Sequence, residues 1–305
     1  MNLNTHLTNF KNHLQDNDFS DLTVRGYLSD LSLFSQWFEK TNGENMSVER
    51  VTPTDIKEYR QHLLSVENRA ASTINRKLAA LSALMQWAVN SGKISSDPTQ
   101  KIKLIRKVES APKWLDKREQ FALSRAIERD LQLARIRFPK RWVTRRRDAS
   151  LVLFMLNTGL RLNEAVSLQV EDVQFSERKG SVLVRNGKGS KQRSIPLNNE
   201  ARQALKDWFE VRPESKFVWT VVEGDAGSSL SGRTVQRLIM RYAQEANLED
   251  LSPHVLRHSF AKNLVNAGVG LEKVAALLGH ESLNTTQIYV TPSEKDLELA
   301  VDTLA

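Results

Sequence analysis

Apolar residues recur at helical spacing in the first hundred residues of the chain. After Asp21, Leu22 and Thr23, apolar side chains are spaced as on one face of a helix, which predicts a helix with a single buried stripe. The stripe consists of Val24, Tyr27, Leu28, Leu31, Phe34, Trp37 and Phe38.

Two further helices are indicated by their ends. Thr52 is followed by a proline, and Asp55 stands three residues after Thr52, as in a capping box, so a second helix is expected to run to Leu64. A third helix is expected to begin after residue 72 or 73 and to end at residues 91–92, a Ser-Gly pair. The first hundred residues therefore predict an all-helical bundle.

Beyond residue 100 the pattern changes. Residues 101–112 alternate charged and apolar side chains without a helical period, which predicts an exposed linker. Asn186 and Gly187 lie between two short strand-like runs, a strong indication of a hairpin. We expect a helical domain over residues 1–105, a linker over 106–113 and a second domain over 114–305. The second domain is predicted to contain helices over residues 115–133, 149–157, 200–210, 232–246, 252–267, 271–278 and 284–289, and strands over 181–185 and 192–197.

Composition excludes several classes of protein. The chain has no cysteine, which excludes disulfides, thiolate catalysis and iron–sulfur clusters. No apolar run approaches the roughly 20 residues that cross a bilayer, and residues 1–12 are polar rather than signal-like. A soluble, cytoplasmic protein without a membrane partner is expected.

The positive charge of the chain is concentrated in one segment. Residues 106–147 contain fourteen Lys and Arg against five Asp and Glu, a local net charge of +9, whereas the whole chain carries +8. Elsewhere acids and bases balance. A basic surface without a specific partner is the alternative, but the uneven distribution favours a nucleic acid as the partner.

Arg161 and Glu164 follow a Thr-Gly-Leu turn and stand three residues apart at the start of a predicted helix. They therefore share one helix face. An isolated pair with this spacing is usually an exposed ion pair of little energetic worth.

His254 and Arg257 occupy the first turns of another predicted helix, which Ser252 caps and a proline opens. Free backbone amides and the helix dipole favour an anion there, and an Arg fork beside a His suits a phosphate on which protons move. His254 could instead cap or pack, and with His258, four residues on, it could form a metal pair. No nearby carboxylate completes a HExxH-type site.

A third motif lies near the end of the chain. Gly279 ends a predicted helix in the usual position, and His280 follows it on a turn. Tyr289 stands nine residues after His280. A single tyrosine is more often a core residue than a nucleophile.

These motifs occur in one order, which closely resembles the tyrosine recombinase and phage-type integrase family over about residues 1–291. The family pattern has a TGLR-x-x-E helix, a Lys between two strands, an H-x-L-R-H box, an LGH box and a terminal Tyr. Each occurs here, with Lys188 in the predicted hairpin. The resemblance implies a mainly α fold: a SAM-like core-DNA-binding domain and an α-rich catalytic domain with a small antiparallel sheet, forming a C-shaped clamp on DNA.

The resemblance also implies the chemistry. Arg161 and Arg257 would hold the non-bridging oxygens of the scissile phosphate, and Tyr289 would attack phosphorus to give a 3′-phosphotyrosyl link. The other implied roles are proton donation to the 5′-oxygen by Lys188, acceptance of the Tyr proton by His254, a phosphate hydrogen bond from His280, and orientation of neighbouring side chains by Glu164. The covalent link keeps the phosphodiester reactive, so no cofactor, ATP or metal is expected, consistent with the lack of a phosphate-binding loop motif.

Further DNA contacts are predicted outside the catalytic motifs. Three arginines recur every four residues opposite an apolar stripe, which places them on one helix face; a solvated face is the alternative. The candidate DNA-binding residues are Arg233, Arg237 and Arg241 on that face, Arg76 and Lys77 at the start of the third helix, and Lys191 and Arg193 beside the hairpin.

The C-terminal residues and the basic segment refine the expected role. Residues 293–304 have apolar side chains at near-helical spacing, and in the family such a tail packs in a neighbouring protomer. This implies a homo-tetramer on paired recombination sites in double-stranded DNA, with possible accessory proteins. Residues 131–147 are longer and more basic than in small Xer-like members, which favours integration, excision or resolution of a mobile element.

Two other functions fit the same residues. A DNA-binding regulator on this scaffold would bind specific sites without strand transfer, but the full set of candidate catalytic residues argues against it. A type IB topoisomerase would relax DNA regardless of sequence and without producing recombinants. The target sequence does not follow from the amino-acid sequence, because groove-reading residues do not map to bases without a complex.

Overall fold

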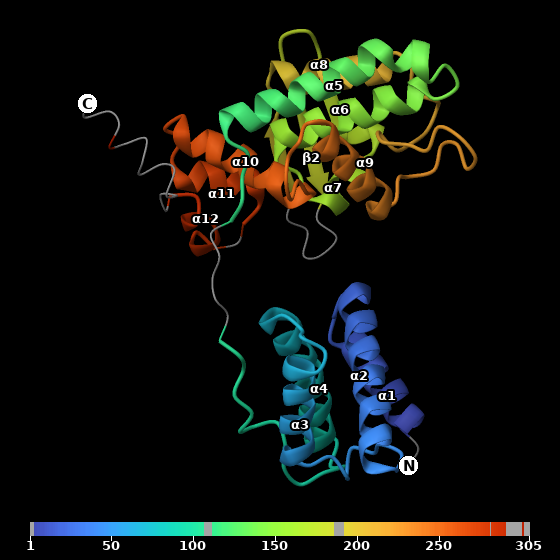
Figure 1. Ribbon diagram of the computed structural model, residues 1–305, viewed down its shortest axis with the longest axis vertical. Coiled ribbons are helices and arrows are strands. Elements are labelled where there is room, and N and C mark those ends of the chain that lie inside the picture. Colours follow the sequence, from blue (N-terminus) through green and yellow to red (C-terminus); the bar gives the residue numbers. More distant parts are fainter. Residues whose placement is uncertain (1–2, 107–111, 186–191, 281, 291–300, 302–305) are drawn as a thin grey trace. The chain divides into compact units, whose positions relative to one another are not determined.

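The computed structural model describes residues 3–106, 112–185, 192–280, 282–290 and 301, and the chain forms two units. The first unit comprises residues 1–109 and the second residues 110–305. Each unit has its own buried core, and Figure 1 labels the helices and strands of both.

The described residues of the first unit form four helices, namely α1 (Leu3–Asp16), α2 (Asp21–Asn42), α3 (Pro53–Ser65) and α4 (Ala71–Asn90). Four members of the predicted stripe of α2 are buried and the other three are partly buried. Its Phe34 ring meets Tyr59 of α3 edge-on, with 4.9 Å between ring centres. Thr52 and Asp55 form the predicted capping box of α3. The predicted bundle is thus confirmed, and its core lies between α2, α3 and α4.

The beginning of the chain differs from the prediction. Helix α1 was not predicted, although Leu3, Leu7, Phe10 and Leu14 stand at helical spacing and Phe10 and Leu14 are buried. Helix α2 begins at Asp21 rather than after Thr23. Its N-cap is Ser20, whose Oγ accepts a hydrogen bond from the Thr23 amide.

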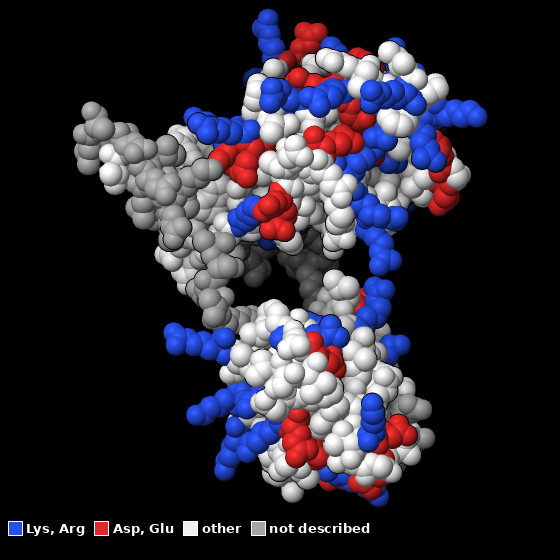
Figure 2. Space-filling view, in the orientation of Figure 1, with Lys and Arg blue, Asp and Glu red and all other residues white. Residues whose placement is uncertain are grey.

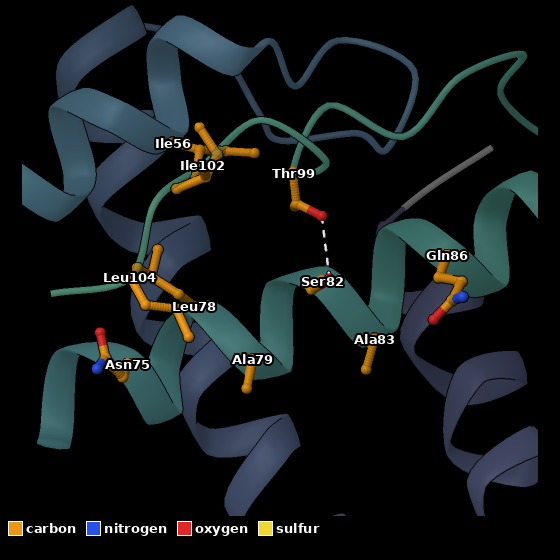
Figure 3. A pocket seen from close by; sticks show the side chains of 10 residues that line it. All are labelled: Ile56, Asn75, Leu78, Ala79, Ser82, Ala83, Gln86, Thr99, Ile102 and Leu104. Atoms are coloured by element: carbon orange, nitrogen blue, oxygen red, sulfur yellow. Dashed lines mark hydrogen bonds between the residues drawn. The ribbon is translucent and has the colours of Figure 1, made fainter. Parts of the chain in front are cut away.

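The segment after α4 packs back onto that helix. The Asn75 side chain exchanges two hydrogen bonds with the backbone of Ile105, at 2.8 and 2.9 Å. Thr99 donates to Ser82 of α4 at 3.0 Å, as Figure 3 shows. The segment and α4 enclose a pocket of about 410 Å³. Residues up to 105 therefore belong to the first unit.

The second unit contains a three-stranded antiparallel sheet in the order β1 (Val173–Phe175), β2 (Gly180–Arg185) and β3 (Gln192–Pro196). In the register of the last two strands, Val184 faces Arg193. Large side chains such as Trp208 and Trp219 fill the core beside this sheet. The surrounding elements are α5 (Lys117–Arg137), α6 (Trp142–Thr158), α7 (Leu162–Ser167), the 3-10 turn Val170–Asp172, α8 (Asn199–Phe209), α9 (Gly232–Glu245), α10 (Pro253–Asn266), α11 (Leu271–Leu278) and α12 (Asn284–Gln287).

Several boundaries of the second unit were predicted wrongly. The basic residues from 135 to 147 are largely helical, since α5 extends to Arg137 and α6 already begins at Trp142. The Arg135 guanidinium lies over the Trp142 ring, 4.6 Å from its centre, and thereby joins the two helix ends. Strand β1 was too short to predict, and α12 ends before Tyr289.

The last helices form a separate small core. Helices α10, α11 and α12 lie together (Figure 1) and bury an apolar cluster that contains Tyr289. Among the described helices, none combines the length and the apolar content that a membrane crossing requires. The candidate site lies where this small core meets α7 and β3.

Candidate active site

A buried carboxylate, Glu164, organises the start of α7. Gly159 ends α6 in the left-handed conformation (φ 63°), and Arg161 is the N-cap of α7. The backbone N–H and the Nη1 of Arg161 donate to the Glu164 carboxylate, at 2.8 and 2.9 Å. The Glu164 side chain is 9% exposed and the Arg161 side chain 39%. The pair is therefore not a simple surface ion pair, because its carboxylate is buried while its guanidinium remains partly in solvent.

Arg193, on β3, binds the same Glu164 carboxylate with both terminal nitrogens of its guanidinium. Its Nη1 and Nη2 donate to the two Glu164 oxygens at 2.9 and 2.7 Å, and its Nε donates to the Leu277 carbonyl at 2.9 Å. A Cβ on Gly279 would lie 2.9 Å from Arg193 Nη1, so this close approach requires glycine. The structure does not support the predicted phosphate contact of Arg193, because all three of its nitrogens bind within the protein.

Arg257, on α10, is the most deeply buried arginine of the site. Its Nη1 donates to the Gly159 carbonyl and its Nη2 to the Leu278 carbonyl, both at 2.7 Å. Nη1 also lies 4.0 Å from Glu164 Oε2. Burial and the neighbouring Arg161 charge lower the pKa of Arg257 to about 10, so it stays positive at neutral pH. Because a guanidinium has five N–H groups, donors remain for a further acceptor.

These four side chains, hereafter the Glu164 cluster, carry unbalanced charge. Burial by itself raises the pKa of the Glu164 carboxyl, but hydrogen bonds from the Arg193 side chain and the Arg161 backbone outweigh it and lower the pKa to about 2. At neutral pH, one negative charge therefore faces the three positive charges of Arg161, Arg193 and Arg257. Such an excess around buried donors is suited to binding an anion, above all a phosphate.

His280 lies beside this cluster on the turn after α11. Its Nδ1 is 2.9 Å from the hydroxyl of Thr286, and the Gly279 carbonyl just before it accepts a bond from Arg161 Nη2 at 3.1 Å. Burial and the charges of Arg257 and Arg161 lower the pKa of His280 to about 4. His280 is therefore neutral at physiological pH and can donate one hydrogen bond without adding charge.

Tyr289 is buried, with 1% of its surface exposed, in the small core with Ala261, Val274 and Leu278. Its hydroxyl lies 2.7 Å from Nδ1 of His258, and its carbonyl accepts a bond from Lys262 Nζ at 3.4 Å. Burial raises the pKa of the Tyr289 hydroxyl, while the charges of Arg257 and Arg161 act in the opposite direction. The same helix, α10, thus holds the tyrosine at both ends.

Sequence reasoning missed His258. It expected His254 to interact with the tyrosine proton, yet His254 is exposed and its ring centre lies 6.5 Å from that of His258. Among the described contacts, no hydrogen bond joins His254 to Tyr289. The two histidines were considered together only as a metal pair; the described residues contain no group of three or more potential ligands. The apolar residues beside His258 on α10 were the available sign that its ring is partly buried.

Part of the basic segment is paired with acids within the second unit. Arg145 Nη1 lies 3.2 Å from Asp130, Arg147 Nη2 lies 2.6 Å from Asp148, and Arg241 Nη2 lies 3.4 Å from Asp148. These arginines pair with acids of the same unit, so the structure does not support Arg241 as an open DNA contact. We call the group the Asp130 cluster; it comprises Arg145, Arg147, Arg241, Asp130, Asp148 and Glu245.

In the first unit, the candidate DNA contacts of α4 are also paired. Arg76 and Lys77 both bind the buried Asp30, with 3.5 Å between Lys77 Nζ and the carboxylate. Only 7% of the Lys77 side chain is exposed, against 52% for Arg76. The structure does not support Lys77 as a groove contact, because its charge is buried against an acid, whereas Arg76 still reaches the surface.

The remaining candidates differ in accessibility. Arg233 and Arg237 of α9 are exposed, as the predicted basic stripe requires. Lys188 and Lys191 lie outside the described residues. On the face drawn in Figure 2, Lys and Arg side chains occur on both units, with acidic side chains between those of the second unit. Positive charge on that face is thus more dispersed than the sequence suggested.

Comparison with known proteins decides the family. Residues 134–296 match the phage integrase family, and residues 7–92 match the phage integrase N-terminal SAM-like domain. The chain belongs to the phage integrase family. It is accordingly a site-specific recombinase of the tyrosine class, as the names of its relatives below indicate. The resemblance of the sequence to tyrosine recombinases is confirmed.

Relatives and solved structures cover nearly the whole chain. The tyrosine recombinase XerD of Ralstonia nicotianae is 32% identical over 88% of this chain and 82% of its own length. The tyrosine recombinase XerC of Thermodesulfovibrio yellowstonii is 31% identical over 97% of this chain and 94% of its own. A XerH recombinase bound to a palindromic difH substrate matches with a TM-score of 0.72 and 24% identity, over 92% of this chain and 79% of that one.

A second solved structure supports the same fold. A lambda integrase dimer bound to a COC′ core site matches with a TM-score of 0.71 and 17% identity, over 95% of both chains. The predicted fold class, a helical SAM-like bundle followed by an α-rich catalytic unit with a small sheet, is confirmed.

Proposed function

We propose that the chain breaks and rejoins double-stranded DNA at specific sites, one strand at a time, through a covalent bond between Tyr289 and phosphorus. The Glu164 cluster carries this proposal, because its three arginines face a single carboxylate at the end of the small core that holds Tyr289. A phosphodiester offers the negative charge that this cluster lacks.

The arginines bind the scissile phosphate. Arg161 reaches solvent with part of its guanidinium, so it meets the phosphate first, and the unused N–H groups of Arg257 approach a second non-bridging oxygen. These donors stabilise the charge that develops at a pentacoordinate phosphorus. Arg193 and Glu164 keep the other two side chains in position.

The reaction transfers the phosphate without external energy. Tyr289 Oη attacks phosphorus, giving a 3′-phosphotyrosyl link, while Lys188 protonates the departing 5′-oxygen. His280 donates a hydrogen bond to the phosphate, and the exposed His254 contacts the DNA beside it. The covalent link conserves the phosphodiester's reactivity, so a 5′-hydroxyl from a second strand can displace the tyrosine.

Assembly on DNA completes the proposed function. The relatives include recombinases solved on their DNA sites, which supports a DNA duplex with specific sites as the substrate. We place four copies on two such sites, with the tail of residues 293–304 packing on a neighbouring copy, and accessory proteins imposing direction where needed. Transposon integrases also share this fold, which keeps a mobile element as the proposed target.

A nicked duplex tests the proposal. If the nick lies just downstream of the cleaved bond, the short 5′-hydroxyl fragment diffuses away and the covalent complex accumulates. Wild-type protein should give a denaturation-resistant adduct, and Tyr289→Phe should give none while still binding the duplex. An adduct that persists in Tyr289→Phe would contradict the proposal.

A further inference from the structure

Two histidines stand four residues apart on α10, and only one of them touches the nucleophile proposed above. His258 Nδ1 lies 2.7 Å from the Tyr289 hydroxyl, with 5.5 Å between the ring centres and 52° between the ring planes. His254 points to solvent. A proton shared between these two atoms would move along an existing hydrogen bond of ordinary length.

The surroundings of this bond suit a neutral base and a protonated phenol. Burial, together with the charges of His254 and Arg257, lowers the pKa of His258 below its ordinary value of 6.5. His280, after α11, also faces it. Burial raises the pKa of Tyr289, so the phenol keeps its proton at neutral pH. A group that is uncharged at neutral pH and 2.7 Å away can accept that proton as the phenol reacts.

We propose that His258, rather than His254, accepts the phenolic proton of Tyr289 when the tyrosine attacks DNA; this inference rests on the proposed function. In the step, the bond between Tyr289 Oη and phosphorus forms, and the bond between phosphorus and the 5′-oxygen breaks. The phenolic proton passes to His258 Nδ1, and a proton from Lys188 passes to the 5′-oxygen. During rejoining, His258 returns its proton to Tyr289, and the incoming 5′-hydroxyl gives its own proton back to Lys188.

The proposal fixes the direction of the pH dependence. His258 must be unprotonated to act as the base, so cleavage falls as pH drops through its pKa. Because that pKa is lowered, the loss begins below pH 6.5 in the free enzyme and appears in kcat/KM. This fall in cleavage rate at acidic pH is hereafter called the acidic limb. The groups that face His258 and influence its pKa are His254 and Arg257 on α10, His280 after α11, and Tyr289 itself.

Single-turnover cleavage of the nicked duplex separates a base from a hydrogen-bonding partner. In His258→Asn, the amide oxygen lies near the former Nδ1 position and accepts the phenol hydrogen bond, but it takes no proton. We expect cleavage about 100-fold slower than wild type, with the acidic limb lost. His258→Ala should be equally slow and should regain activity with added imidazole, in proportion to its neutral fraction. The matched variant His254→Asn should keep the acidic limb.

The outcomes distinguish this inference from the proposed function. If wild type forms no adduct, the proposed function fails. If wild type forms the adduct but His258→Asn cleaves within about 3-fold of it with the acidic limb intact, the inference about His258 is overturned. The same holds if the limb disappears in His254→Asn instead. Because wild type must itself lose activity below pH 6.5, a flat wild-type profile also overturns the inference, whichever variants fold.

Discussion

The Glu164 cluster and the Asp130 cluster both bury arginines in the second unit, but their charges balance differently. In the Asp130 cluster three arginines meet three carboxylates, and Tyr242 adds a hydrogen bond to Asp130 at 2.8 Å. In the Glu164 cluster three arginines share one carboxylate. The described residues therefore neutralise one cluster and leave the other positive.

This difference separates a structural role from a chemical one. A buried charge without a partner destabilises a fold, so a balanced network persists for packing alone, whereas an excess of positive charge is suited to binding an anion. The counts of arginine are equal in the two clusters and do not distinguish them. The carboxylate partners distinguish the clusters, and some of these pairs, such as Arg193 with Glu164 and Arg241 with Asp148, join distant parts of the chain.

Arg161→Ala should give the largest effect on the reaction. Loss of a donor to the developing phosphate charge is expected to slow cleavage about 10³-fold, or about 4 kcal/mol in the barrier. Stability should change little, because the Arg161 backbone still binds Glu164. Single-turnover rates measure the effect, and Arg145→Ala in the Asp130 cluster is the control. A comparable loss of cleavage rate in Arg161→Ala and Arg145→Ala would contradict the separate roles of the two clusters.

Asp130→Asn should affect stability and not chemistry. The change leaves the partly buried Arg145 without its closest carboxylate, inside a network that includes the buried Arg147, and is expected to lower the free energy of unfolding by about 3 kcal/mol. Urea denaturation measures it. The cleavage rate of the folded fraction should match wild type; a selective loss of rate would place this cluster in the reaction.

Glu164→Gln should change how the stability of the fold depends on pH. The folded pKa of about 2 lies below the ordinary 4.5, so the carboxylate stabilises the fold above pH 4.5, and this stability is lost as pH falls towards 2. At pH 7 the contribution is about 3 kcal/mol. Denaturation at several pH values should show a flatter acid dependence in Glu164→Gln than in wild type. Parallel curves would contradict the charge assignment.

Arg233→Ala combined with Arg237→Ala should give the smallest effect. If these exposed arginines bind phosphates, the slope of log affinity against log salt should decrease by about 2, without a change in site preference. Binding titrations at several salt concentrations measure the slope. Arg178→Ala combined with Lys179→Ala, which removes two exposed positive charges from the turn between β1 and β2, is the charge-matched control. An unchanged slope in the double variant would show that this face of α9 is exposed to solvent without binding phosphates.

The sequence was sufficient to predict features that depend on residues close together in the chain. Helix caps such as Thr52 with Asp55, and the start of α7 at Arg161, depend on residues three apart and were predicted correctly. Long-range partners were not predictable, because no local pattern states that Arg193 of β3 meets Glu164, or that Arg241 meets Asp148. The choice between His254 and His258 depended on the position of Tyr289, which only the packing of α10 against α11 and α12 determines.

The central claim is that Tyr289 carries the phosphate, and the adduct itself tests it most directly. Trypsin should release residues 274–295 as one peptide, in which Tyr289 is the only tyrosine. After nuclease digestion of an adduct trapped on the nicked duplex, mass spectrometry should find this peptide joined through Tyr289 to a 3′-phosphate. A phosphate on another residue, or a link to the 5′ end of the DNA, would contradict the account.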